Sequence, residues 1–139
     1  ELASTDKLKL ISKRERFSHN TWTHNHPSFV HGKHDRNYLN MNTNDALARD
    51  LQSDQWVRLS NHQGEIHVQL AITDDMMPGA VSLCHGWGHQ RVPGLSVASR
   101  TEGTNVNILA RDGLDSLEPL SGMAHLNGIV VEVSAIQGT

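Results

Sequence analysis

Two arginines near the start of the sequence have the chemistry to bind an anion. Arg14 and Arg16 follow Ser12 and Lys13 in a short polar run. A guanidinium forms paired hydrogen bonds with phosphate or carbonyl oxygens, and Ser and Lys side chains can add further donors. Residues 1–36 carry an excess of Lys and Arg, whereas the chain as a whole has a formal net charge of -3. This asymmetry favours an anionic ligand near the first loop, and the alternative is a solvated run of charges.

A second candidate segment combines glycine with tryptophan at residues 85–89, His-Gly-Trp-Gly-His. Glycine lets a backbone approach a ligand closely, and Trp87 can stack on a flat ring or seal a lid. The alternative is a glycine-rich turn anchored by a buried Trp87. A metal site formed by Cys84, His85 and His89 is disfavoured, because no carboxylate lies nearby in the sequence to support it.

A third candidate segment is rich in asparagine at residues 103–107. An amide side chain offers both a donor and an acceptor, so Asn107 can read the edge of a heterocycle in two directions. The alternative is that Asn105 and Asn107 cap a helical turn over Val106–Leu109. Both interpretations hold if each asparagine takes one of the two roles.

Histidines crowd the first long loop, where His24, His26, His31 and His34 precede Asp35. Zinc uses such ligands, and an independent His-dependent metal hydrolase is therefore an alternative function. The spacing matches no compact metal-binding motif, so we favour hydrogen bonding within a polar loop that faces a cofactor or another domain.

Short alternating segments must position these loops. Ile66, Val68, Leu70 and Ile72 alternate with polar residues, as in a half-buried strand. Asn42 or Thr43 can cap a short helix, and Gly64 can supply a positive φ in a hairpin turn. Strands are expected at 7–12, 38–41, 55–60, 65–73, 80–84 and 128–134. With two long loops at 13–36 and 85–104, the pattern predicts a mainly β barrel with short helices.

Length and composition exclude several classes of protein. The 139 residues suit one domain, residues 1–139, without a membrane span or a basic nucleic-acid stripe. Cys84 is the only cysteine, which excludes an intrachain disulfide and favours the cytoplasm over the periplasm. The first residues show no secretory leader, and the missing initial Met suggests a piece of a longer chain. Asp74 and Asp75 are expected in a turn before Pro78-Gly79, not in acid/base catalysis.

Eight motifs follow one another over about residues 8–133. They lie at residues 10–16, 20–25, 42–47, 57–60 with Gly64, 73–79, 85–89, 103–109 and 119–122. In order and spacing they resemble the C-terminal molybdopterin guanine dinucleotide-binding domain of the molybdopterin oxidoreductases, the dimethyl sulfoxide reductase family. The resemblance implies a double-psi β-barrel of the aspartate decarboxylase-like kind.

The resemblance also implies a function shared with the rest of a larger enzyme. The full-length parent would bind bis(molybdopterin guanine dinucleotide) with molybdenum or tungsten, and an iron–sulfur cluster would lie in its N-terminal part. The isolated domain is expected to be an inactive monomer that holds no catalytic residue or metal ligand. A purely structural barrel is a further alternative. The expected cofactor contacts are Ser12, Lys13, Arg14, Ser18, His19, Asn20, Thr21, His85, Trp87 and Asn107.

Overall fold

Alternation of apolar and polar side chains builds six strands in the computed structural model, which describes residues 7–136. Along β3 and β4, Val57, Leu59, Ile66, Val68 and Leu70 point inward and are almost fully buried. Their neighbours point to solvent, because successive strand side chains face opposite sides. The strands are β1 (Leu8–Lys13), β2 (Tyr38–Met41), β3 (Trp56–Ser60), β4 (Glu65–Ile72), β5 (Ala80–Cys84) and β6 (Ile129–Ala135).

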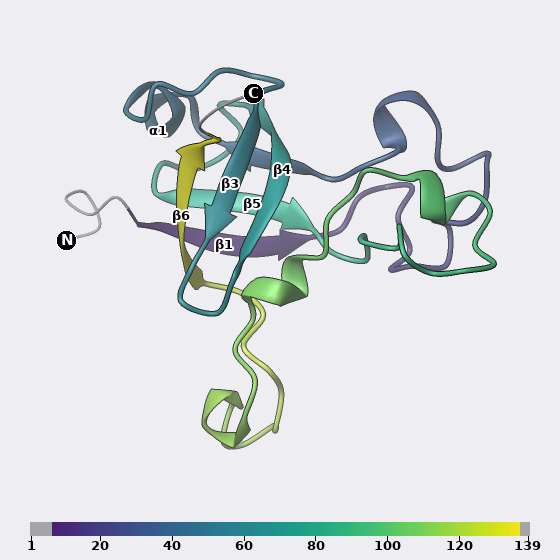
Figure 1. The fold of residues 1–139 in the computed structure, drawn as a ribbon. Coiled ribbons are helices and arrows are strands. Elements are labelled where there is room, and N and C mark those ends of the chain that lie inside the picture. Colours follow the sequence, from purple (N-terminus) through teal and green to yellow (C-terminus); the bar gives the residue numbers. More distant parts are fainter. Residues whose placement is uncertain (1–6, 137–139) are drawn as a thin grey trace.

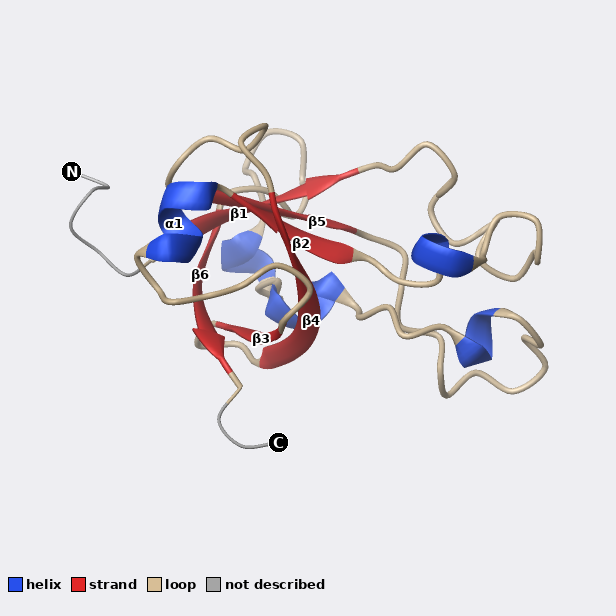
Figure 2. Ribbon diagram, turned by 90° about the horizontal axis from the view of Figure 1, so that it is seen from above, coloured by secondary structure: helices blue, strands red, loops and turns tan. Residues whose placement is uncertain are grey.

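The six strands close into a barrel in the order β1-β5-β2-β4-β3-β6 (Figures 1 and 2). Two neighbouring pairs are parallel, β1 with β5 and β2 with β4, and the other four are antiparallel. Each parallel pair joins strands that are distant in the sequence, so the chain crosses the barrel between them. The expected mainly β fold and its double-psi barrel are confirmed.

The barrel interior is filled by leucine, valine and methionine from all six strands. Leu10, Leu39, Leu59, Leu70 and Leu83 have no exposed surface. Close packing of this kind makes the barrel a rigid platform for the loops that leave it.

One α-helix and four 3-10 turns complete the regular structure of residues 7–136. Helix α1 (Thr43–Leu47) begins as expected, with the Asn42 side chain accepting a hydrogen bond from the Asn44 amide at 2.9 Å. The 3-10 turns are η1 (Gly32–His34), η2 (Ala98–Arg100), η3 (Val106–Leu109) and η4 (Leu114–Ser116). No helix among residues 7–136 is long and apolar enough to cross a bilayer.

The two long loops extend from the same end of the barrel (Figures 1 and 2). They start side by side because β1 and β5 are parallel and Lys13 lies opposite Cys84. We call residues 14–37 and 85–105 together the loop lobe. Residues 110–128 form a separate projection, which we call the arm, at the bottom of Figure 1.

The β3–β4 turn differs from the expectation that Gly64 would supply a positive φ. Gly64 does not adopt a positive φ. Instead the Asn61 side chain closes the turn by accepting hydrogen bonds from the Gln63 and Gly64 amides, at 2.8 and 3.3 Å. A Cβ on Gly64 would lie 3.0 Å from Ile108 Cγ2. The absence of a side chain at Gly64 therefore lets η3 pack closely against this turn.

Candidate functional site

A cavity of about 520 Å³ lies where the first loop, the segment after β5 and η3 meet. Six of the ten expected cofactor contacts line it. We call it the Ser12–His85 pocket. Its walls are Ser12, Arg14, Asn20, Thr21, His85, Gly86, Val106, Asn107, Ala110, Leu126, Asn127 and Ile129.

A chain of hydrogen bonds orders the polar side of this pocket. Ser12 Oγ lies 3.0 Å from His85 Nδ1, and His85 Nε2 lies 3.1 Å from Asn20 Oδ1. A neutral imidazole has one donor and one acceptor, and an amide oxygen only accepts. With Nε2–H donating to Asn20, Nδ1 accepts from the Ser12 hydroxyl. The arrangement leaves the Asn20 amide nitrogen without a partner among residues 7–136.

Further donors at the pocket are also unused by the described residues. The exposed Arg14 guanidinium forms no ion pair or hydrogen bond within residues 7–136. The exposed Asn107 side chain likewise has no partner there. A cation and two free amides thus converge on a space that also has apolar walls at Val106, Leu126 and Ile129. This donor set suits a flat, polar, anionic ligand.

The two asparagines of the third motif divide the expected roles. Asn105 Oδ1 accepts a hydrogen bond from the Asn107 amide at 3.0 Å and caps η3. Asn107 lies within η3 and lines the pocket. The capping interpretation is confirmed for Asn105, and the side chain of Asn107 remains available for a ligand.

Four expected contacts do not line the Ser12–His85 pocket. Lys13 follows Ser12 on β1, so its side chain leaves the opposite face of the strand. Ser18 is buried and lies 2.7 Å from His24 Nε2, while His19 is exposed on the first loop. Trp87 is buried against His24, with ring centroids 4.1 Å apart. For Trp87 the structure supports the alternative of a buried anchor.

Sequence reasoning missed four residues of the pocket, Ala110, Leu126, Asn127 and Ile129. Asn127 Oδ1 accepts a hydrogen bond from the Ser12 backbone amide at 2.7 Å. The contact joins residues from the two ends of the chain, because β1 pairs with β6. The only local signal was the turn dipeptide Asn127-Gly128 before the last strand.

His24 ties the two halves of the loop lobe together. Its Nδ1 donates to the Gly86 carbonyl at 2.8 Å, and its Nε2 accepts from Ser18 Oγ at 2.7 Å. Both ring nitrogens are therefore occupied. Within residues 7–136 no group of three or more His, Cys, Asp or Glu residues is placed to hold a metal ion. The histidines thus give no structural support to the metal-hydrolase alternative.

Lowering the pH should weaken the hydrogen bonds by which His24 joins the two halves of the loop lobe. Burial lowers the pKa of His24 below its usual 6.5; the Gly86 carbonyl opposes this shift, and His89 and His85 add to it. The unfolded state therefore binds the extra proton more readily, and stability rises with pH over this range. We expect neutral His24 to contribute its full share of the folding stability above pH 6.5. This share is lost as the pH falls through the lowered pKa of His24.

The measurement is the free energy of unfolding between about pH 8 and about pH 5 for the chain, His24→Gln and His19→Gln. His24→Gln should flatten the dependence on pH. His19→Gln, which changes an exposed histidine of the same loop, should leave it unchanged. Equal slopes for all three proteins would contradict the role of His24.

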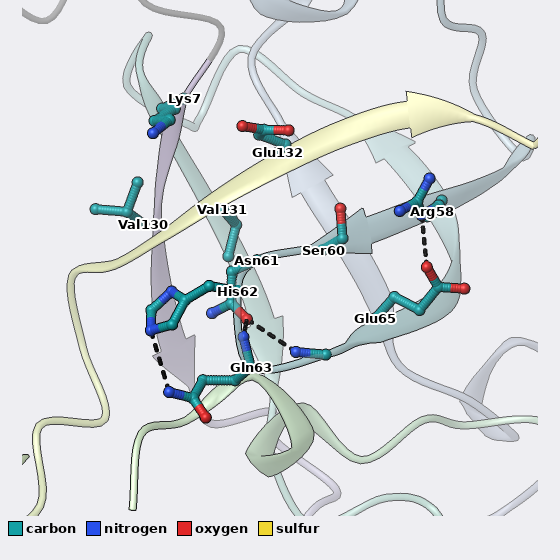
Figure 3. Close-up of a pocket in the computed structure, with 11 residues that line it drawn as sticks. Lys7, Arg58, Ser60, Asn61, His62, Gln63, Glu65, Val130, Val131 and Glu132 are labelled. Carbon is teal, nitrogen blue, oxygen red and sulfur yellow. Dashed lines mark hydrogen bonds and ion pairs between the residues drawn. The ribbon is translucent and has the colours of Figure 1, made fainter.

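A second cavity, of about 730 Å³, lies elsewhere and is lined by the β3–β4 hairpin, β6 and Lys7 (Figure 3). Two pairs of its polar side chains bond to each other. Arg58 pairs with Glu65 at 2.8 Å, and His62 Nε2 lies 3.1 Å from Gln63 Nε2. It shares no residue with the Ser12–His85 pocket. This hairpin surface brings together none of the expected contacts.

Comparison with known proteins agrees with the fold. The structure superposes on acetylene hydratase from Pelobacter acetylenicus with a TM-score of 0.75 and 20% sequence identity, over 93% of this chain and 18% of that one. The chain thus spans about a fifth of that protein. The rationally designed protein mkDPBB_sym_86 gives a TM-score of 0.45 at 9% identity, over 94% of this chain and 91% of the designed one. No curated protein matches the sequence.

The sequence itself identifies the family. The family model for the molydopterin dinucleotide binding domain matches residues 8–129. That range contains the strands β1 to β5, the loop lobe and the arm. The chain therefore belongs to the molydopterin dinucleotide binding domain family.

Proposed function

We propose that this chain forms one wall of the site for a molybdopterin guanine dinucleotide in a larger molybdenum- or tungsten-dependent oxidoreductase. The observation that carries the proposal is the meeting of Ser12, Arg14, Asn20, Thr21, His85 and Asn107 in one pocket. These residues come from three segments distant in the sequence. Membership of the family supports the same assignment.

The donors present in the pocket fit such a ligand. Arg14 has the charge and geometry to bind a phosphate or a ring carbonyl. Asn20 and Asn107 offer amides to heterocycle edges, and Ile129 and Leu126 offer apolar surface to a flat face. The Ser12–His85–Asn20 hydrogen bonds fix the orientation of the Asn20 amide. When bound, the cofactor would supply redox chemistry at its metal, while this chain would bind and orient it.

Other domains of the larger enzyme would complete the cofactor site. A cavity of about 520 Å³ that is open to solvent would enclose only part of a dinucleotide, so other domains would cover the rest. Those domains would supply the metal ligand, the substrate site, any iron–sulfur cluster and a second pterin. The isolated chain would be inactive. The single, buried, unpaired Cys84 is consistent with a cytoplasmic parent.

Removing a pocket donor should weaken cofactor retention in the full-length parent. Arg14→Ala and Asn107→Ala each delete a contact with an anionic or polar ligand. Hydrogen bonds to charged groups contribute about 1.5–3 kcal/mol, so we expect affinity to fall roughly tenfold to a hundredfold for Arg14→Ala and less for Asn107→Ala. The measurement is molybdenum or tungsten and pterin per protein after dialysis.

Arg16→Ala and Asn44→Ala are the matched controls. Arg16 is also an exposed arginine of the first loop, but it lies over the Phe17 ring and lines a different cavity. Asn44 is exposed on α1. Both controls should retain the cofactor. Full cofactor content in Arg14→Ala and Asn107→Ala would favour the purely structural barrel.

A further inference from the structure

The junction between the arm and β6 contains the chain's only asparagine that is followed by glycine. Asn127 and Gly128 connect the arm to Ile129, the first residue of β6 (Figure 1). Asparagine before glycine is especially prone to lose its side-chain amide, because the attacking glycine nitrogen is not hindered by a Cβ. Both residues are exposed, so water reaches this peptide bond.

The loss of the amide needs no reactant other than water. The Gly128 nitrogen attacks Asn127 Cγ, the Cγ–Nδ2 bond breaks, and the amide leaves as ammonia with the proton of the Gly128 nitrogen. A cyclic succinimide results. Water then opens either carbonyl–nitrogen bond of this ring and leaves a carboxylate, as aspartate or as isoaspartate. In isoaspartate the main chain runs through the former side chain and is longer by one carbon.

Two hydrogen bonds to β1 hold the groups that would react. The Gly128 amide donates to the Leu10 carbonyl at 2.8 Å. The Ser12 amide donates to Asn127 Oδ1 at 2.7 Å, and both bonds extend the antiparallel pairing of β1 with β6. The Leu10 carbonyl thus holds the proton that the Gly128 nitrogen must lose. Ring closure therefore requires the start of β6 to separate from β1.

The products would change the charge of the Ser12–His85 pocket. Asn127 lines this pocket together with Arg14, whose guanidinium has no partner among residues 7–136. A carboxylate at position 127 adds a negative charge beside that cation and repels an anionic ligand. In isoaspartate the longer main chain also alters the spacing of the two hydrogen bonds to β1.

We propose that Asn127 is a site of spontaneous deamidation, that the pairing of β1 with β6 limits its rate, and that its products weaken anion binding in the Ser12–His85 pocket. The last part rests on the proposed function. Because the ammonia is lost, the reaction does not reverse. The state of Asn127 therefore records how often the start of β6 has separated from β1.

Peptide mapping of the full-length parent tests the site and its restraint. The folded parent and a synthetic peptide of residues 124–130 are incubated at mildly alkaline pH. Mass spectrometry then measures the aspartate and isoaspartate formed at position 127. We expect both products in the parent, at a rate at least about tenfold lower than in the peptide, because pairing with β1 must open first. Equal rates in parent and peptide, or conversion in the peptide alone, would overturn the proposal.

Val131→Ala and Val68→Ala test whether separation of β6 sets the rate. Both valines are 1% exposed in the barrel core. Val131 lies on β6 opposite Leu8, whereas Val68 lies on β4, which pairs with β2 and β3. The two changes remove the same atoms, but only Val131→Ala loosens β6 against β1 directly. We expect deamidation at position 127 to be at least about threefold faster in Val131→Ala than in Val68→Ala, and equal rates would contradict the restraint by β6.

Pterin content separates this inference from the proposed function. Asn127→Asp carries the charge of one product without incubation, and Asn44→Asp adds the same charge at an exposed position of α1. We expect the Asn127→Asp parent to retain at least about fivefold less pterin than the Asn44→Asp parent after dialysis. Equal retention would overturn the effect of the products on the pocket. Absence of pterin from the unchanged parent would reject the proposed function, whereas the deamidation of Asn127 is read by mass alone.

Discussion

Trp87→Ala should lower the free energy of unfolding by about 3–5 kcal/mol, the cost of truncating a buried large aromatic side chain. Trp87 is 4% exposed, its ring stacks on His24 and it lies over Gly103, where an added Cβ would clash with the indole at Cε3. Removing the indole empties the space between the two halves of the loop lobe. Chemical denaturation of the chain measures the effect.

Trp22→Ala is the matched control, because Trp22 lies in the same lobe and is 83% exposed. It should change stability by less than about 0.5 kcal/mol. Trp87→Phe should recover part of the loss by restoring a ring against His24. If Trp87→Ala left stability unchanged and removed only the cofactor from the parent, Trp87 would be a ligand contact and the buried-anchor interpretation would be wrong.

Gly86→Ala should be the second most damaging change. Gly86 adopts a φ of 91°, and a Cβ there would lie 2.6 Å from the carbonyl oxygen of Asn20. The left-handed conformation costs a residue with a Cβ roughly 1–2 kcal/mol, and overpacking against backbone adds about 1–3 kcal/mol. Asn20 would have to move, so the parent should also lose cofactor. Denaturation and pterin content measure the two effects.

Gly94→Ala separates the two causes. Gly94 has a similar φ of 87° in the same loop, but nothing lies within 4 Å of its added Cβ. It should show only the conformational cost and should retain the cofactor. Equal losses of stability for Gly86→Ala and Gly94→Ala would mean that the close approach of Gly86 to Asn20 contributes nothing.

Local patterns were sufficient to predict the barrel strands. The bounds of β2 and β5 are those expected, and Asn42 caps α1 as expected. Alternation works here because each strand has one face in a common core, which selects apolar residues at every second position. The strand order around the barrel came only from the resemblance, since periodicity carries no information on which strands pair.

The site was less predictable, for a physical reason. Loop sequences show no periodic pattern of apolar residues. The residues that a loop side chain contacts depend on how the strands pair to close the barrel. Ser12 was expected in the site, but its bond to Asn127 depends on pairing between the first and last strands. Ser18 and Trp87 have residue types that suit a ligand, yet both are buried within the loop lobe around His24. Composition alone does not distinguish these two uses.

The pairing of β6 with both β1 and β3 has a consequence for biosynthesis. Among the six strands, β1 is synthesised first and β6 last. One edge of β1 and one edge of β3 therefore stay unpaired until residues 129–135 of β6 are made. Until then, two strands keep open edges, which are prone to association with other chains. Asn127 reaches Ser12 only when that last strand docks. This contact of the Ser12–His85 pocket therefore forms only after residues 129–135 have been made and have paired.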